Sequence, residues 1–168
     1  MMNVSRGVLL CCVLAATAGC DRVTKHLALT ALSGHPDQSY LADTVRLQYH
    51  ENPGAFLSVG ASWSPQVRAA VFQIGNALFL VALAIAARRR RWSRMEAYGL
   101  ALFFAGALSN LIDRVAMGSV IDFLNVGIGP LRTGIFNVAD VAIMAGVGCL
   151  LWEAGRSFYT SAVSSRHD

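Results

Sequence analysis

Residues 69–87 read AAVFQIGNALFLVALAIAA, and this stretch decides the class of fold. Its nineteen residues carry no charge, and their only strongly polar members are Gln73 and Asn76. An α-helix needs about 20 mostly apolar residues to cross the hydrocarbon layer of a bilayer. The whole chain has the same character, because 55% of its 168 residues are hydrophobic and only 14% are charged. An ordinary soluble domain is therefore excluded, and the sequence predicts a mainly α membrane protein.

Three other apolar stretches come close to that length. The sequence predicts four transmembrane helices in one polytopic membrane domain covering residues 1–168, with spans over about residues 5–26, 67–87, 95–114 and 134–153. The first span is the weakest, because Gly7–Cys20 is only fourteen apolar residues, which is also the length of a secretory signal. We expect a retained helix, since its removal would leave three spans, an odd number. A lipoprotein anchored at Cys20 is the alternative.

The basic residues predict the orientation of these helices. Lys and Arg collect in cytoplasmic loops, and five arginines lie between the second and third predicted spans. With the N-terminus inside, eight basic residues are cytoplasmic: Arg6, Arg88, Arg89, Arg90, Arg91, Arg94, Arg156 and Arg166. Six are then outside: Arg22, Lys25, Arg46, Arg68, Arg114 and Arg132. Both termini are therefore expected in the cytoplasm, with outer regions at about residues 27–66 and 115–133.

The outer side of the membrane is where the polar chemistry is expected. Seven of the ten acidic residues lie at or beyond the outer ends of the spans: Asp21, Asp37, Asp43, Glu51, Asp113, Asp122 and Asp140. In the first outer region Val45, Leu47 and Tyr49 alternate with polar residues, and a period of two is typical of a strand. The sequence therefore predicts a small extracytoplasmic β-sheet.

Several classes of ligand are not expected. The basic residues do not share a polar surface with interleaved aromatic residues, so the sequence does not indicate a nucleic-acid partner. The four cysteines, Cys11, Cys12, Cys20 and Cys149, lie in apolar stretches without CxxC spacing, and no histidine stands at zinc-ligand spacing. We interpret them as small packing residues, and we expect neither a metal site nor a cofactor.

Polar residues at the edges of the spans are candidates for function, because each costs free energy unless it is paired or faces water. Four groups stand out: Asp21 with Lys25, Asn52 with Gly54 and Phe56, Asn110 with Asp113 and Arg114, and Asn137 with Asp140. The first three also have structural interpretations, as a helical ion pair, a turn in a loop and a helix-end anchor. Asp140 is different, because no cation lies within a helical turn of it, so another element must meet its charge.

Asp122 raises the same question, since it stands between Ile121 and Phe123 without a local cation. Two lone acids in apolar surroundings, both near the outer boundary, suggest a pair that faces one water molecule. Carboxylates brought close together cannot both ionise easily, so they share a proton, and one acts as base while the other acts as acid. A proton relay and a purely structural role remain alternatives. The sequence does not favour a zinc metalloprotease or a serine hydrolase, because it has no HExxH motif and no serine nucleophile elbow.

Five motifs follow one another along the chain: Asp21-Arg22-Val23-Thr24-Lys25, Asn52-Pro53-Gly54-Ala55-Phe56, the segment from Gly106 to Arg114, Val120-Ile121-Asp122-Phe123 and Phe136-Asn137-Val138-Ala139-Asp140. In this order they resemble the motifs of lipoprotein signal peptidase (signal peptidase II), a family of aspartyl membrane peptidases. The four-span topology with both ends inside agrees with that family. One departure is visible, because many members read Asn-x-Gly-Ala-Ala-Phe, whereas here Ala55 alone separates Gly54 from Phe56.

The resemblance implies an aspartic endopeptidase with Asp122 and Asp140 as its catalytic pair. It implies as substrate a prolipoprotein whose lipobox cysteine carries diacylglycerol, cut on the amino side of that cysteine. Substrate-binding or supporting roles are implied for eight further residues: Asp21, Lys25, Asn52, Gly54, Asn110, Asp113, Arg114 and Asn137.

The resemblance also implies a multi-pass protein of the bacterial cytoplasmic (inner) membrane, in contact with membrane lipids, with its active site at the outer, periplasmic face. We expect a monomer. Two other functions remain open: another intramembrane aspartyl protease, whose acids would lie deeper in the membrane, and a small proton-coupled transporter, which could also use paired acids.

Overall fold

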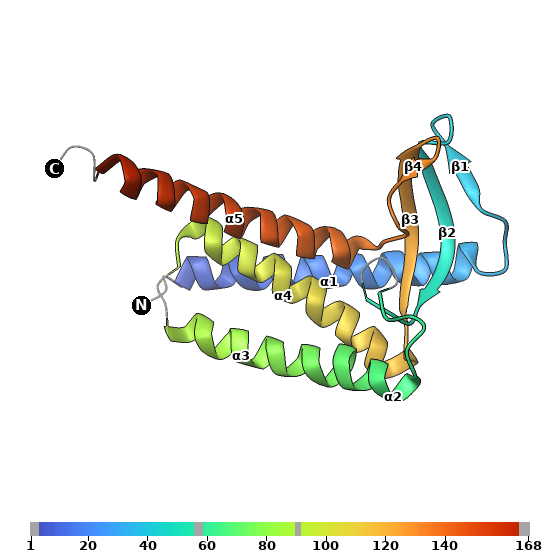
Figure 1. Ribbon diagram of the computed structural model, residues 1–168, viewed down its shortest axis with the longest axis horizontal. Coiled ribbons are helices and arrows are strands. Elements are labelled where there is room, and N and C mark those ends of the chain that lie inside the picture. Colours follow the sequence, from blue (N-terminus) through green and yellow to red (C-terminus); the bar gives the residue numbers. More distant parts are fainter. Residues whose placement is uncertain (1–3, 56–58, 90–91, 165–168) are drawn as a thin grey trace.

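Four long helices form the body of the molecule in the structure, a computed structural model that describes residues 4–55, 59–89 and 92–164 (Figure 1). The first is α1 (Val4–Leu32), and the second combines α2 (Pro65–Arg68), the π-helix η2 (Ala69–Gly75) and α3 (Asn76–Arg89). The third and fourth are α4 (Arg94–Met117) and α5 (Val138–Ser164). Four segments are long and apolar enough to cross a membrane: Gly7–Leu32, Pro65–Arg88, Arg94–Met117 and Val138–Thr160. The predicted four-helix membrane fold is confirmed.

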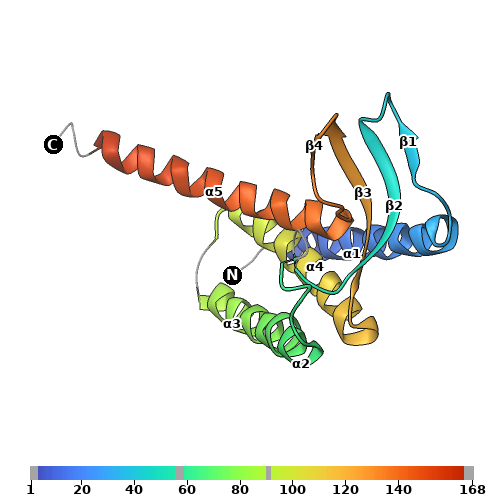
Figure 2. The same ribbon diagram turned by 45° about the vertical axis from the view of Figure 1, so that its right-hand side comes forward.

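Helix α4 packs against each of the other long helices, and small residues bring α5 closest to it (Figure 2). A Cβ atom on Gly106 would lie 2.3 Å from the carbonyl oxygen of Ala139, and one on Gly146 would lie 2.5 Å from that of Gly99. Such contacts let two backbones touch, which is how membrane helices gain packing energy without a hydrophobic drive between them. The start of α5 is therefore held directly against the middle of α4.

An antiparallel sheet lies across one end of the helices (Figure 1). Its strands, in spatial order, are β1 (Gln38–Tyr40), β2 (Val45–Asn52), β3 (Val120–Ile128) and β4 (Leu131–Arg132). The predicted strand pattern in the first outer region corresponds to β2, and its partner β3 comes from the second outer region, with His50 opposite Asp122. Ala28 and Leu32 of α1 pack with Ile121 beneath the sheet, so the last turns of α1 support it.

Helix α5 continues to Ser164, past the expected end near residue 153, and two other helix boundaries differ from the predicted spans for identifiable reasons. Helix α1 continues to Leu32, past the expected end near residue 26, because Ala28 and Leu32 of its last turns pack against Ile121 of β3. Helix α5 begins at Val138 rather than near residue 134, since Phe136 pairs with Leu124 of β3 instead of joining the helix. A hydropathy pattern contains no information about either of these tertiary contacts.

Candidate active site

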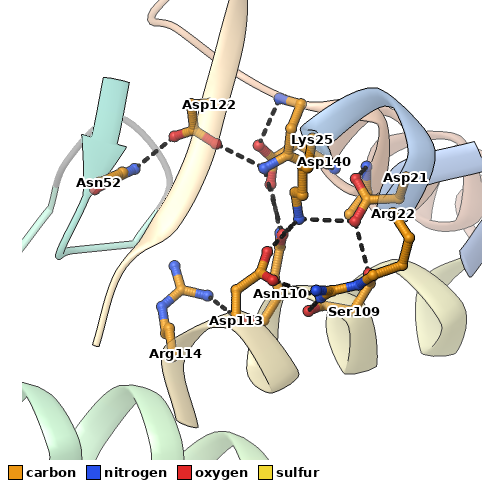
Figure 3. Close-up of polar contacts among 12 residues, drawn as sticks. Asp21, Arg22, Lys25, Asn52, Ser109, Asn110, Asp113, Arg114, Asp122 and Asp140 are labelled. Atoms are coloured by element: carbon orange, nitrogen blue, oxygen red, sulfur yellow. Dashed lines mark hydrogen bonds and ion pairs between the residues drawn. The ribbon is translucent and has the colours of Figure 1, made fainter. Parts of the chain in front are cut away.

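The side chain of Asn137, directly before α5, joins the two acids that the sequence singles out. Its Nδ2 atom donates to Oδ1 of Asp122 at 2.6 Å. Nδ2 of Asn52 donates to the other oxygen of Asp122 at 2.9 Å (Figure 3). Strands β2 and β3 run side by side here, so the end of one brings Asn52 to Asp122 on the other. Asp122 is only 2% exposed.

Asp140 lies in the first turn of α5 and closes a reciprocal cap with Asn137. The backbone N–H of Asp140 donates to Oδ1 of Asn137 at 3.0 Å, and the backbone N–H of Asn137 donates to Oδ2 of Asp140 at 3.2 Å. This pattern satisfies two amide groups that a helix start otherwise leaves without partners. Nδ2 of Asn110 reaches the remaining oxygen of Asp140 at 2.9 Å. Asp122 and Asp140, the aspartate pair, are thus both held by N–H donors and both linked to Asn137.

A second set of charges lies beside this pair, between α1 and α4. The buried ammonium of Lys25 contacts three oxygens: Oδ2 of Asp21 at 2.7 Å, Oδ2 of Asp113 at 2.6 Å and Oδ1 of Asn110 at 2.8 Å. Arg22 reaches Oδ1 of Asp113 at 2.5 Å. We call Asp21, Arg22, Lys25 and Asp113 the ion-pair cluster. Because Lys25 occupies the oxygen of the Asn110 amide, the amide nitrogen of Asn110 is the end that faces Asp140.

Asp21 connects the ion-pair cluster to the start of α5. Its Oδ1 accepts a hydrogen bond from the backbone N–H of Ala139 at 2.9 Å, and its Oδ2 accepts one from Ser109 Oγ at 2.6 Å. A carboxylate at a helix N-terminus is favoured by the helix dipole and by the free amide groups there. Three helices therefore meet at Asp21, which contacts the residue directly before Asp140.

Arg114 departs from the arrangement that its spacing suggests. Asn110 and Asp113 both face Lys25, whereas Arg114 is directed away toward the loop after β2, where its NH2 atom donates to the carbonyl oxygen of Gly54 at 2.7 Å (Figure 3). Its guanidinium lies 5.9 Å from the ring centre of Phe72 in η2. The Nε atom of Arg114 is buried and has no hydrogen-bond partner among the described residues. Asp113 and Arg114 thus serve different neighbours and do not form one helix-end anchor.

The loop after β2 is a turn whose form depends on Asn52. The backbone N–H of Gly54 donates to Oδ1 of Asn52 at 3.0 Å, and Nδ2 of Asn52 donates to the carbonyl of Ala55 as well as to Asp122. An asparagine that bonds its own following backbone in this way fixes a tight turn. Phe56, the third residue of this predicted group, lies outside the described residues.

Two hollows adjoin Asp140. The larger, about 560 Å³, lies between η2 and α3 on one side and α4 and α5 on the other, and its lining includes Phe72, Phe103 and Arg114. The smaller, about 250 Å³, is lined by residues 133–136 and Val141. Asp140 and Met144 line both. Most of the other lining residues are apolar. An apolar chain bound in either hollow would therefore exclude water from it, and water would remain only at the edge of the aspartate pair.

Burial in these surroundings raises the pKa of the Asp122 carboxyl to about 6. The hydrogen bond from Asn52 opposes the rise, the charge of Asp140 adds to it, and Asn137 and Lys25 oppose it more weakly. A carboxyl that titrates near neutral pH can both take up and release a proton, which general acid–base chemistry requires. No group of three or more His, Cys, Asp or Glu side chains in the described part of the chain is placed to hold a metal ion.

Several residues at the site escape sequence reasoning. Arg22 counts in the sequence only as an outer cation, yet it pairs with Asp113 and also bonds the carbonyl oxygen of Ser109. Ser109 Oγ bonds Asp21, and Gln73 of the π-helix bonds the carbonyl oxygen of Arg114 at 2.8 Å. Gln73 could have been suspected, because it is one of two strongly polar residues in the clearest span. Ser109 carries no such signal on its own.

Comparisons with known proteins identify the family of this chain. The family model described as signal peptidase (SPase) II matches residues 13–156. A lipoprotein signal peptidase of Desulforapulum autotrophicum is 37% identical over 147 residues, covering 87% of this chain and 91% of that protein. One from Syntrophomonas wolfei is 37% identical over 133 residues, covering 78% and 81%.

The fold has a solved counterpart as well. A bacterial membrane enzyme determined by the in meso method at 2.3 Å resolution superposes with a TM-score of 0.79 at 25% identity, over 89% of each chain. The matched residues include the whole polar site, from Asp21 to Asp140, and the family model covers most of the chain. The chain belongs to the signal peptidase II family, the membrane proteases that remove signal peptides from prolipoproteins.

Proposed function

We propose that Asp122 and Asp140 are the catalytic pair of this peptidase. The observation that carries the proposal is the Asn137 side chain, whose amide nitrogen bonds Asp122 while its amide oxygen bonds the backbone of Asp140. Residues 18 positions apart, one on a strand and one on a helix, are thereby tied to a single group. Neither carboxyl has a hydrogen bond from a cationic side chain among the residues described, which leaves both able to exchange a proton.

In this mechanism one carboxylate of the pair removes a proton from a water molecule as the water oxygen attacks the scissile carbonyl carbon. The protonated partner donates a hydrogen bond to the carbonyl oxygen, which gains negative charge, and later a proton reaches the departing amine. The pKa of Asp122 near 6 suits this exchange of roles. Asn52 and Asn110 hold the two carboxyls in place through one hydrogen bond each.

Arg114 is proposed to bind the substrate backbone. Its side chain borders the larger hollow beside Asp140, and its buried Nε–H group lacks a partner among the residues that the structure describes. A buried donor without an acceptor costs free energy, and a substrate carbonyl would remove that cost. Gly54 and Phe72 restrain the guanidinium from either side, so the donor is already positioned.

The larger hollow fits a substrate with a long apolar part. Phe79, Phe103 and Ile143 line it below the level of the aspartate pair, among residues of membrane-spanning helices. Diacylglycerol chains and the apolar stretch of a signal peptide both match such a lining, and a lipid-bearing cysteine would then bring its peptide bond to Asp140. We propose a diacylglyceryl-modified prolipoprotein, cut on the amino side of that cysteine.

The same proposal includes the setting of the enzyme. It is a single membrane domain that acts as a monomer in the bacterial cytoplasmic membrane, with both termini in the cytoplasm and the aspartate pair at the outer face. The excess of basic residues around the loop between α3 and α4 supports this orientation. The beginning of α1 and the end of α5 lie at the same end of the bundle, as an even number of crossings requires (Figure 1).

The test is cleavage of a synthetic diacylated prolipoprotein by the reconstituted enzyme. We expect Asp122→Asn and Asp140→Asn each to lower kcat/KM by about 10³-fold or more, since each removes one half of the acid–base pair. Asp37→Asn, which changes an exposed acid of the outer region, is the matched control and should cleave normally. Retention of a tenth of the activity by either active-site variant, with the control unaffected, would remove that residue from the catalytic pair.

A further inference from the structure

The end of the sheet farthest from the active site carries an apolar surface that no part of the described chain covers. It consists of two adjacent turns, residues 41–44 between β1 and β2 and residues 128–131 between β3 and β4, which we call the sheet tip. Leu41, Ile128 and Leu131 are 76%, 78% and 83% exposed there. Three large aliphatic side chains this exposed on a few residues are unusual on a surface that faces only water.

The sheet tip is built to be rigid. Leu41, Ala42 and Asp43 are consecutive residues with positive φ angles of 53°, 51° and 67°, a backbone conformation that residues other than glycine rarely adopt. The carboxylate of Asp43 holds the turn by accepting hydrogen bonds from Arg46 and Ser39, and Arg132 of β4 donates to the carbonyl oxygen of Asp43 at 2.6 Å. Strain of this kind persists where the surroundings enforce it, often at a functional surface.

The charges at the sheet tip are satisfied internally, and this decides what kind of partner fits. Arg46 pairs with Asp43, and Arg132 bonds both Asp43 and Asn125. The hydrogen bonds from Arg46 and Ser39 hold the pKa of the Asp43 carboxyl well below its usual range, so the cluster stays charged and closed. What the tip offers outward is therefore aliphatic rather than ionic, with Tyr40, 49% exposed, at its edge.

The position of the sheet tip identifies the partner. The strands run across the axes of the membrane-spanning helices, and the tip extends sideways past the start of α5, beyond the outline of the bundle, in both views (Figures 1 and 2). At that level and distance from the bundle, the neighbouring material is the lipid around the helices. We propose that the sheet tip inserts Leu41, Ile128 and Leu131 into the interfacial layer of the bilayer, as an anchor independent of the four helices.

This anchor would set the depth of the active site. Strand β3 carries Ile128 at the tip and Asp122 at the site, six residues or about 20 Å away, and β2 connects Val45 to Asn52 in the same way. A tip fixed in the lipid interface holds both strands at a constant level. The backbone of the turns stays at the hydrated boundary, as open loops require, while only the side chains enter.

Fluorescence in phospholipid nanodiscs tests the contact directly. Leu131→Trp adds one indole to the three native tryptophans, and we expect lipids brominated near the top of their chains to quench the added signal strongly. His35→Trp, on the exposed loop after α1, is the matched control and should remain unquenched. Equal quenching of the two added indoles would overturn the proposal. The proposal would also be overturned if the indole added at position 131 were quenched by a prolipoprotein with brominated acyl chains and not by brominated lipids.

A functional comparison uses the triple variant Leu41→Ser, Ile128→Ser and Leu131→Ser. We expect its kcat/KM on a lipidated substrate to fall about fivefold in nanodiscs and to be unchanged in detergent micelles, which adapt their surface to the protein. The variant Leu41→Met, Ile128→Val and Leu131→Met keeps the apolar character and should behave as the unmodified enzyme in both. An equal loss in nanodiscs and micelles for the serine variant would contradict anchoring.

Discussion

Two clusters of carboxylates lie side by side in this protein, and one is bound by cations while the other is bound by neutral amides. In the ion-pair cluster Asp21 and Asp113 contact the cations Lys25 and Arg22 at 2.5–2.7 Å. In the aspartate pair Asp122 and Asp140 are held by the amides of Asn52, Asn110 and Asn137. A cation favours the ionised form strongly, whereas a neutral N–H donor favours it more weakly and leaves the carboxyl able to take up a proton. The comparison shows how one membrane protein holds cation-paired acids and the proposed catalytic pair side by side.

The side-chain amide of Asn110 connects the two clusters by hydrogen bonds. Lys25 binds its oxygen, so its nitrogen is presented to Asp140. An asparagine with the opposite orientation would place its oxygen against the carboxylate, where two acceptors would repel one another. The fixed charge of Lys25 thus determines which end of the Asn110 amide Asp140 meets.

The largest effect that would challenge this comparison is expected at Lys25. Lys25→Met leaves the buried carboxylates of Asp21 and Asp113 with Arg22 as their one remaining cation. Removing one partner of a buried ion pair costs about 3–5 kcal/mol of stability. Thermal unfolding of the purified protein in detergent measures the loss. Arg22→Met is the matched control, because Arg22 is 43% exposed and its removal should cost about 1 kcal/mol or less. Equal losses for both variants would show that burial does not distinguish these cations.

An intermediate effect is expected at Asn137, where two roles can be separated. Asn137→Ser keeps a side-chain oxygen able to cap α5 but removes the N–H donor to Asp122, and Asn137→Ala removes both. We expect each to lower kcat/KM by about 10²-fold, because the aspartate pair loses its shared support. Only the alanine variant should lose a further stability of about 1 kcal/mol. A serine variant with full activity would show that the capping oxygen alone maintains the pair.

The smallest effect concerns the pH dependence of the reaction. A carboxylate must be ionised to accept a proton from water, so kcat/KM should fall as the pH falls through the pKa of Asp122 near 6. The Asn52 hydrogen bond favours the ionised form and lowers this pKa, so Asn52→Ala should move the acidic limb of the profile to higher pH. Gln48→Ala, on the same strand, should leave the limb in place. A limb that moves to lower pH in the Asn52 variant would reverse the assigned role.

Much of the architecture was accessible from the sequence, because a membrane imposes a simple length rule. The four apolar helices and the strand at Val45 follow from hydropathy and a period of two. Asp122 and Asp140 stood out because each is an acid in apolar surroundings without a local cation. These signals are local, and they survive folding unchanged.

What the sequence could not supply is contact between distant segments. The pairing of β2 with β3, the ion pair of Arg22 with Asp113 and the bond of Ser109 to Asp21 each join residues about 70 to 90 positions apart. The end of α1 and the start of α5 also depend on tertiary contacts, with Ile121 and through the bridge of Phe136 to Leu124, which is why both boundaries differ from the prediction. The sheet tip is equally non-local, since its two turns come from the two outer regions of the chain.

The reciprocal cap at Asn137 and Asp140 has a consequence for inhibitor design. An inhibitor that donates a hydrogen bond to Oδ2 of Asp140 shares that oxygen with the main-chain N–H of Asn137 and therefore has to fit beside the opening turn of α5. Compounds that approach the other carboxyl oxygen, from the side of the larger hollow, displace only a side-chain amide. Drug resistance by substitution is correspondingly constrained there, because a replacement at either residue must still begin a helix.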